Sequence, residues 1–310
     1  MTTVQKTDIA KNVVLGSTSI TVTRKPFSTI SGPTKGQDII CFVGFCPNIG
    51  TRYQMIPVES LEQILAILAG DLSNEDNVSA VKDSSIYQSL VSSWAVGGRN
   101  AIIMRLGDTD ELVDLTDDEK YQLIYDRLAV AYPLITDNEY IQYVVPIDAI
   151  AEGYTKENSS FLDFLKQAAF AMAKAINLGT FQQAIISTAS SSVTILKNAE
   201  SIRQKEDWQF RDPAQSYCYS SDLGWLPNND AYRFVAVPAG RALFSYPEYD
   251  VSFEGGLAPA FAGLSAWLPY DVSSMGRILH GVRLFNPLSK DDADILSLAG
   301  YIPLGETARQ

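Results

Sequence analysis

The chain has 310 residues, of which 46% are hydrophobic, 19% charged and 10% aromatic, and its formal charge is -12 at pH 7. This composition indicates a folded protein and excludes a disordered one, and the acidic balance without a local Lys and Arg cluster argues against nucleic acid as a ligand. The apolar runs are far shorter than the ~20 residues of a membrane helix, and the polar start lacks a signal-peptide core, so we expect no membrane insertion and folding in the cytoplasm.

The N-terminal segment is predicted to form an arm. Within residues 12–25, polar and β-branched residues alternate, which favours a short strand. The residues that carry this alternation are Ser19, Ile20, Thr21, Val22 and Thr23. Residues 28–36 are rich in Ser, Thr, Pro and Gly and should form a loop. Residues 1–36 are therefore expected to be an arm and linker that precede the body.

Strands and helices are predicted to alternate through residues 37–249. The expected strands are residues 39–43, 101–104, 140–145, 184–186, 217–219 and 234–237. The expected helices begin near Ser60, Ser85, Thr116, Ser160 and Ser192, where a hydroxyl can cap a helix. We expect the third of these helices to break before Pro133. The alternation predicts an α/β fold with a three-layer arrangement around a mostly parallel sheet.

The character of the sequence changes from Asp250 onward, where Gly, Pro and aromatic residues become frequent. Residues 288–299 are expected to form a short helix with Asp291, Asp292 and Asp294 near its start, where carboxylates suit the helix dipole. Residues 250–310 are therefore predicted to be a short α+β C-terminal part.

The three cysteines, Cys41, Cys46 and Cys218, argue against a disulfide framework because their number is odd and the chain is long. We expect them to be reduced thiols in the core. The C-x4-C spacing of Cys41 and Cys46 lacks a second pair of ligands nearby, so a structural zinc ion is not expected. No metal or cofactor is predicted.

An α/β body raises the possibility of an enzyme, but the sequence offers little for one. The single histidine, His280, lies between Leu279 and Gly281, outside the alternating body and far from other ligand-type residues. The G-x-S-x-G motif of serine hydrolases and the phosphate-binding loop motif are both absent from the sequence. Asp148, just past a predicted strand, and Asp250 are carboxylates without an identifiable partner. We expect no catalysis; the alternative is an α/β enzyme with a site near Asp148 and His280.

Several segments, taken in chain order, resemble the contractile tail sheath family of bacteriophages and related injection systems. Residues 57–62 are similar to the stretch that leads from the first strand into a helix in that family. Residues 87–106 resemble its helix, paired glycines and following strand that ends in Arg. The positions that carry the resemblance most clearly are Gly97, Gly98, Arg105, Pro238, Gly240, Pro259 and Gly300. Together the segments span residues 39–304, nearly the whole chain.

The resemblance implies a subtilisin-like core without a protease triad, and a mechanical function without a cofactor. Sheath subunits form stacked hexameric rings around a tail tube protein and contract to drive the tube through a cell envelope. The expected partners are therefore further copies of the chain, the tube protein, and possibly baseplate and tail terminator proteins. The expected location is the virion tail, after synthesis in the host cytoplasm. A non-polymerising collar or baseplate relative is the alternative within the family.

The resemblance also implies that terminal arms add strands to the sheets of neighbouring subunits, which requires strand propensity more than a fixed sequence. Residues Ser19 to Thr23 meet that requirement, although an ordinary edge strand on the same subunit is equally compatible with them. One departure concerns the C-terminus. Typical sheath proteins continue into a tube-contacting C-terminal domain, whereas this sequence stops at Gln310. That domain is expected to be absent or truncated.

Overall fold

The structure is a computed structural model of the whole chain. It describes residues 12–15, 18–21, 38–47, 51–147, 149, 159–177, 181–188, 234–268, 279–285 and 288–304. The chain divides into two compact units, Met1–Lys35 and Gly36–Gln310. Among the described residues, no helix is both long and apolar enough to cross a membrane.

The N-terminal unit contains a small antiparallel hairpin of β1 (Asn12–Leu15) and β2 (Thr18–Thr21). Val13 is paired with Ile20, and Val14 with Ser19. The sequence predicted a single strand at this place, and the structure instead has two. Only β2 carries the period-2 alternation, whereas β1 is Asn-Val-Val-Leu and does not alternate, so alternation alone could not reveal the first strand or the turn. The predicted loop at residues 28–36 lies outside the described residues.

The second unit is built on a six-stranded sheet with the strand order β4-β5-β3-β6-β7-β8. Its strands are β3 (Ile39–Phe45), β4 (Met55–Val58), β5 (Ala101–Gly107), β6 (Ile141–Pro146), β7 (Gln183–Ile185) and β8 (Val235–Ala236). Four of the five pairings are parallel, as expected, but β4 runs antiparallel to β5, so the sheet is mixed. Pro57 suits β4 because an edge strand tolerates a residue without an N–H.

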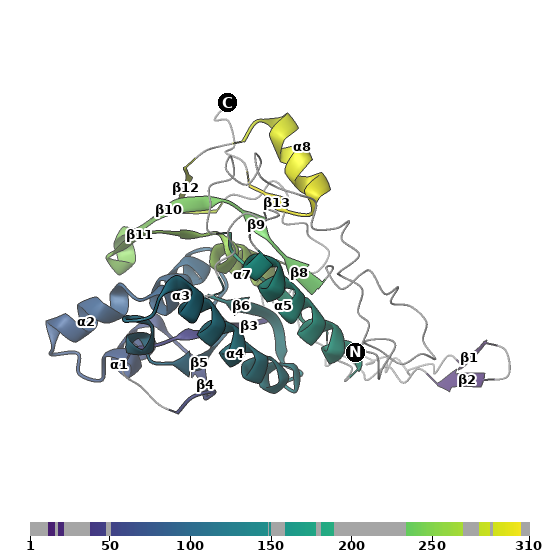
Figure 1. The fold of residues 1–310 in the computed structure, drawn as a ribbon, viewed down its shortest axis with the longest axis horizontal. Coiled ribbons are helices and arrows are strands. Elements are labelled where there is room, and N and C mark those ends of the chain that lie inside the picture. The colour runs from purple at the N-terminus through teal and green to yellow at the C-terminus, as the bar shows by residue number, and fades with distance from the viewer. Residues whose placement is uncertain are drawn as a thin grey trace, which may run out of the picture. The chain divides into compact units, whose positions relative to one another are not determined.

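Two apolar cores lie against this sheet, because successive residues of a strand point to opposite faces. Cys41 and Val43 of β3 belong to one core, with side chains of α4 (Asp117–Thr136) and α5 (Ser159–Asn177). Ile40 and Phe42 belong to the other, with side chains of α1 (Leu61–Ala69), α3 (Ser85–Ala95) and α7 (Ala258–Trp267). Figure 1 shows these helices around the sheet.

Two helix starts follow the sequence prediction closely. Ser60 accepts a hydrogen bond from the Gln63 N–H at 3.1 Å. Thr116 and Glu119 form a reciprocal capping box at the start of α4. The sequence did not predict α2 (Glu75–Lys82), which Asn74 caps through the N–H groups of Asp76 and Asn77. With Val81 as its only buried side chain, α2 lacks the apolar stripe on which the prediction relied.

The predicted break before Pro133 is wrong, because α4 continues to Thr136. Proline lacks the N–H that would bond four residues back and disfavours a helical conformation of the residue before it. Here the last turn is held by burial of Tyr132 and Ile135 in the core. The Gln182 side chain adds hydrogen bonds to the carbonyls of Ile135, at 3.2 Å, and Asn138, at 3.0 Å. Tertiary contacts therefore outweigh the local cost of Pro133.

The last third of the described chain forms two further small sheets. One is antiparallel, with the strand order β11 (Val251–Gly256), β10 (Arg241–Tyr246) and β12 (Val282–Leu284). The other pairs β9 (Pro238–Ala239) in parallel with β13 (Ile302–Pro303), just after α8 (Lys290–Ala299). Short 3₁₀ turns, η1 (Thr109–Leu112) and η4 (Pro247–Tyr249), complete the described elements. The predicted helix at 192–208 and strand at 217–219 lie outside the described residues.

Candidate functional site

The paired glycines of the sheath-like pattern lie where α3 meets α7. A Cβ atom on Gly98 would contact Gly263 Cα and would lie 2.6 Å from Ser93 Oγ. A Cβ on Gly97, whose φ is 107°, would lie 2.6 Å from the Trp267 ring. Pro259 lies in the first turn of α7, which is buried on nearly every side. The structure thus brings two distant motif segments together, and their residues serve helix packing.

A second pair of motif segments meets at the β9–β13 pairing. Pro238 is paired with Ile302, and the Ile302 N–H donates to the Val237 carbonyl at 2.8 Å. Gly300 ends α8 in the left-handed conformation with φ 103°. The Gly240 N–H donates to Thr188 Oγ1 at 2.9 Å, and its φ is 114°. These positions therefore connect the C-terminal helix to the main sheet and do not form a polar site.

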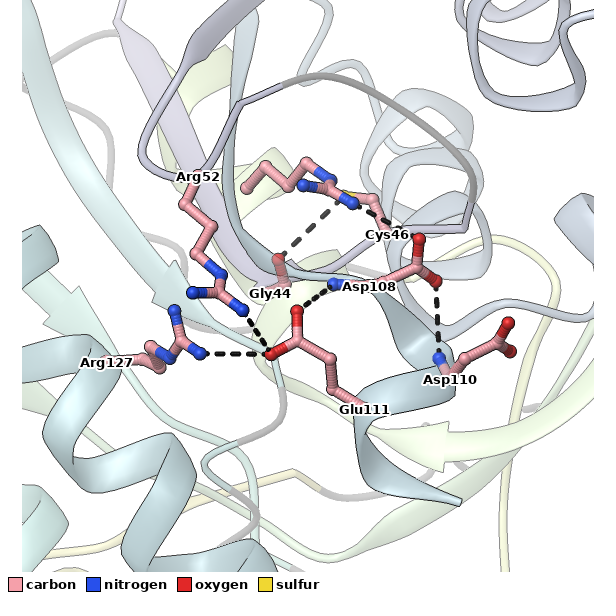
Figure 2. Close-up of polar contacts among 8 residues, drawn as sticks. Gly44, Cys46, Arg52, Asp108, Asp110, Glu111 and Arg127 are labelled. Atoms are coloured by element: carbon pink, nitrogen blue, oxygen red, sulfur yellow. Dashed lines mark hydrogen bonds and ion pairs between the residues drawn. The ribbon is translucent and has the colours of Figure 1, made fainter. Parts of the chain in front are cut away.

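Arg105 lies near the carboxyl end of β5 and belongs to a cluster of charged side chains with Asp108, which Figure 2 labels. Its side chain is 8% exposed, and Nη2 donates to Asp108 Oδ2 at 3.3 Å. The Arg105 carbonyl accepts the Tyr53 N–H at 2.7 Å, and Tyr53 has a φ of 63°, which is uncommon for a bulky residue. The sequence placed Arg105 at the end of the strand, whereas β5 continues to Gly107.

Glu111 is the centre of that cluster. Its Oε2 atom lies 2.8 Å from Arg52 Nη2 and 3.0 Å from Arg127 Nη2, and its Oε1 atom accepts the Asp108 N–H at 3.0 Å. Partial burial disfavours the charged carboxylate, but the Asp108 N–H and the two guanidinium groups outweigh it, so the pKa of Glu111 lies below its usual value. One carboxylate therefore joins the loop before β4, the η1 turn and α4.

The arginines of the cluster already form ion pairs with protein carboxylates, as Figure 2 shows. An anionic ligand could bind there only if these pairs separated. The cluster also lacks a nucleophile hydrogen-bonded to a base, since its acidic groups are bound to Arg and backbone N–H groups. We interpret it as a structural ion-pair network at the carboxyl ends of β3 and β5.

Glu111→Gln is expected to lower the free energy of unfolding by about 1–2 kcal/mol at pH 7, because two charge-assisted contacts are weakened and Arg52 is half exposed. The stabilisation requires the carboxylate form. Because the folded pKa lies below the usual glutamate value of 4.5, the difference between the two proteins is present above that pH and disappears as the pH falls through the folded pKa. Urea unfolding at pH 7 and at low pH measures it, with Glu139→Gln as the control for loss of one exposed charge.

A small pocket of about 130 Å³ lies beyond the carboxyl ends of β6 and β7, where α/β enzymes often bind substrates. It is lined by Ser85, Gln88, Ser89, Ile147, Ser187, Thr188, Arg241, Phe253, Glu254, Gly255, Gly256 and Pro259. Two of its hydroxyls have structural hydrogen bonds. Ser187 Oγ accepts the Ala258 N–H at 3.1 Å, and Thr188 Oγ1 accepts the Gly240 N–H. The described lining includes neither His nor Cys, so it offers no Ser–His or Cys–His pair.

The residues of the enzyme alternative do not assemble into a site in the described part of the chain. Asp148 itself lies outside the described residues. His280 is exposed in the turn before β12. Asp250 has a left-handed φ of 53° and forms an exposed ion pair with Lys82 at 3.0 Å. Within the described ranges, no group of three or more His, Cys, Asp or Glu side chains could hold a metal ion.

Two of the three cysteines are buried free thiols, as predicted. Cys41 is fully buried in β3, and burial raises the pKa of its thiol to about 12. Cys46 Sγ donates to the Gly44 carbonyl at 3.8 Å. Cys218 lies outside the described residues. Since the thiolate is the reactive and metal-binding form, Cys41 is unsuited to either role.

The predicted assembly arm coincides with the hairpin. Ser19, Ile20 and Thr21 lie in β2, whereas Val22 and Thr23 lie outside the described residues. A two-stranded hairpin is marginally stable in water without further packing or a third strand. The assembly role of these five residues stays a prediction.

Comparison with known proteins gives one informative similarity. The sequence matches no protein-family model and no curated protein. The fold, however, is similar to that of the helical sheath of the anti-feeding prophage in its contracted state, with a TM-score of 0.51 and 10% identity over 95% of this chain. The match covers 66% of the sheath chain, so this chain spans just under two thirds of its length. A baseplate structure of the same prophage in the contracted state has a TM-score of 0.44 and 14% identity, over 81% of this chain and 54% of that chain. The chain thus has a contractile-sheath-like fold.

Proposed function

We propose that this chain is a structural subunit of a contractile tail sheath, which polymerises as stacked rings around a tail tube and contracts to drive that tube through a cell envelope. The observation that carries the proposal is the sheath-like fold over 95% of the chain. The motif segments that suggested this family from sequence also pack against one another in pairs.

The finer features of the proposal concern how the chain is divided. Residues 37–249 would be the sheath core, with a three-layer, subtilisin-like arrangement, and residues 250–310 would lead toward a C-terminal domain. Residues 1–36 would be the arm that adds a strand to a neighbouring subunit. The partners would be further copies in hexameric rings, the tube protein, and baseplate or terminator proteins, in a virion tail assembled in the host cytoplasm.

The geometry of the described residues supports a mechanical function more than catalysis. The most connected polar group, Glu111, is bound to two arginines and a backbone N–H. The pocket at the carboxyl ends of the strands has its Ser187 and Thr188 hydroxyls bound to backbone N–H groups. Such hydrogen bonds stabilise loops, whereas a nucleophile needs a neighbouring base.

Electron microscopy of the purified full chain in negative stain tests the proposal. We expect rings or tubes in the presence of the tube protein from the same particle, because sheath subunits assemble around a tube. A chain that stays monomeric with the tube protein under every assembly condition would contradict the proposal. Discrete complexes with baseplate proteins alone, without rings or tubes, would instead identify a non-polymerising relative.

A further inference from the structure

An aromatic pocket with an acidic rim lies on the surface between α4 and α5. Its volume is about 520 Å³, and its described lining consists of Asp118, Tyr121, Gln122, Tyr125, Asp163 and Phe164. Neither the resemblance to sheath proteins nor the motif residues assign a role to this place. The pocket is large enough for the end of one long side chain from a partner molecule.

The three aromatic rings of the pocket surround one space. Tyr121 and Tyr125 are separated by one helical turn and therefore lie on the same face of α4. Their ring centroids lie 6.0 Å and 5.9 Å from that of Phe164, at interplanar angles of 51° and 59°. Phe164 is only 2% exposed and forms the floor, while both tyrosines are partly exposed. Tilted rings of this kind present negatively polarised faces, which attract cations.

Carboxylates add to this attraction. Asp118 and Asp163 are exposed and line the pocket from the two helices. Burial, followed by the negative charges of Asp163 and Asp126, raises the pKa of the Tyr125 hydroxyl.

Packing of α4 on α5 accounts for part of this arrangement. Gln167 Nε2 donates to the Tyr125 carbonyl at 2.9 Å and so ties the two helices together. Asp118 also lies in the first turn of α4, where a carboxylate suits the helix dipole. Neither packing nor the dipole requires two partly exposed rings beside carboxylates from both helices. Exposed aromatic faces with adjacent negative charge are the features that recognise an ammonium or guanidinium group.

The charge distribution of the chain indicates where such a group is available. The first compact unit, Met1–Lys35, carries a net charge of +4. Its charged residues are Lys6, Lys11, Arg24, Lys25 and Lys35, together with Asp8. Because the whole chain carries -12, residues 36–310 carry -16. The N-terminal segment of one copy is thus complementary in charge to the body of a neighbouring copy, where the proposed assembly would place it.

We propose that the pocket between α4 and α5 binds a Lys or Arg side chain from the basic N-terminal segment of a second copy of this chain. The inference rests on the proposed assembly, because a second copy must supply the segment. Asp118 and Asp163 attract the cation, and Tyr121 and Tyr125 contact it over Phe164. The contact would hold the N-terminal segment of one copy on the body of the next. Because the contact is between charges, the affinity between subunits would fall as the salt concentration rises.

Binding of a labelled peptide with the sequence of residues 1–35 to the full chain tests the pocket, by fluorescence anisotropy at low salt. We expect Tyr125→Leu and Asp163→Asn each to weaken binding roughly 3- to 10-fold, which corresponds to about 0.7–1.4 kcal/mol. The first substitution removes a cation–π contact and the second removes an attractive charge. Tyr125→Phe should retain most of the affinity because it keeps the ring. Matched controls at the other end of α4, Tyr140→Leu and Asp137→Asn, should leave binding unchanged. A peptide with Gln at its five basic positions should bind far more weakly.

Equal affinity of the wild-type chain, Tyr125→Leu and Asp163→Asn for the peptide would overturn the inference, as would equal binding of the Gln peptide. Asp163 is exposed, so we expect Asp163→Asn to fold as the wild type does. The unfolding midpoints of the other variants show whether they also remain folded. The result is separable from the proposed function. Normal rings or tubes from the pocket variants with unchanged peptide binding would reject only the pocket, whereas pocket-dependent binding without polymers would reject only the sheath assignment.

Discussion

Gly98→Ala is expected to destabilise the second compact unit by about 3 kcal/mol, because the added methyl group would overlap backbone atoms of α7. The added Cβ would contact Gly263 Cα, and it would lie 2.6 Å from Ser93 Oγ and 3.0 Å from the Gly263 carbonyl. Two of these three atoms belong to the backbone of α7, so a rotamer change cannot relieve the contact. The helices α3 and α7 would have to move apart, and both contribute to the core around Phe42.

Urea unfolding of the purified chain measures this effect, with Gly70→Ala as the matched control. Gly70 ends α1 with a φ of 70°, and a Cβ there meets no atom within 4 Å. Its substitution should therefore cost only the strain of a left-handed conformation, about 1–2 kcal/mol. A Gly98→Ala midpoint equal to or above that of Gly70→Ala would show that α3 and α7 separate easily, and it would contradict the interpretation of the motif glycines as packing residues.

The fold was predictable where local sequence and tertiary environment agree. The strand β3 reads as a continuous apolar run because both its faces are covered, by Cys41 and Val43 on one side and Ile40 and Phe42 on the other. The start of α4 was predictable because its capping box is entirely local. Such signals need no knowledge of distant residues. The strands and helices through α5 were predicted from them, except for β4 and α2, which the sequence analysis missed.

The fold was not predictable where distant residues decide the outcome. The last turn of α4 survives Pro133 because Gln182 binds its terminal carbonyls, and nothing near Pro133 in the sequence indicates that. Similarly, α7 is rich in small residues and apolar on all sides, so it has no helical periodicity to detect. It forms because Gly98 and Gly263 allow the close approach of α3, a pairing between distant segments.

The candidate sites differ in the same way. Gly97, Gly98 and Gly300 were singled out by pattern, and the structure explains each by a close approach or a left-handed conformation. The Glu111 network escaped the sequence analysis because its arginines come from separate segments. The sequence did contain a signal for the aromatic pocket, because Tyr121 and Tyr125 are one helical turn apart in α4. The same spacing, however, is typical of an apolar stripe that faces the core, so it fits a buried pair as well as a surface pocket. Only their partial exposure distinguishes the two interpretations.

Ile20→Pro is expected to abolish rings and tubes while leaving the body folded. Ile20 lies in β2 opposite Val13. Proline there fixes φ at about −65° and removes a backbone N–H that either pairs within the hairpin or is available to a strand added beside it. If the hairpin joins a neighbouring sheet through main-chain hydrogen bonds, one such substitution should remove most of the pelletable polymer.

The unfolding midpoint of the second unit should not change with Ile20→Pro, because both apolar cores consist of residues after Lys35. Ile20→Val is the matched control: it keeps a β-branched side chain and the N–H, so polymers should form as in the wild type. Sedimentation followed by negative-stain microscopy measures the outcome. Full polymer yield from Ile20→Pro would mean that β2 makes no strand contact between subunits, and the arm of the proposed sheath would have to be sought elsewhere in the chain.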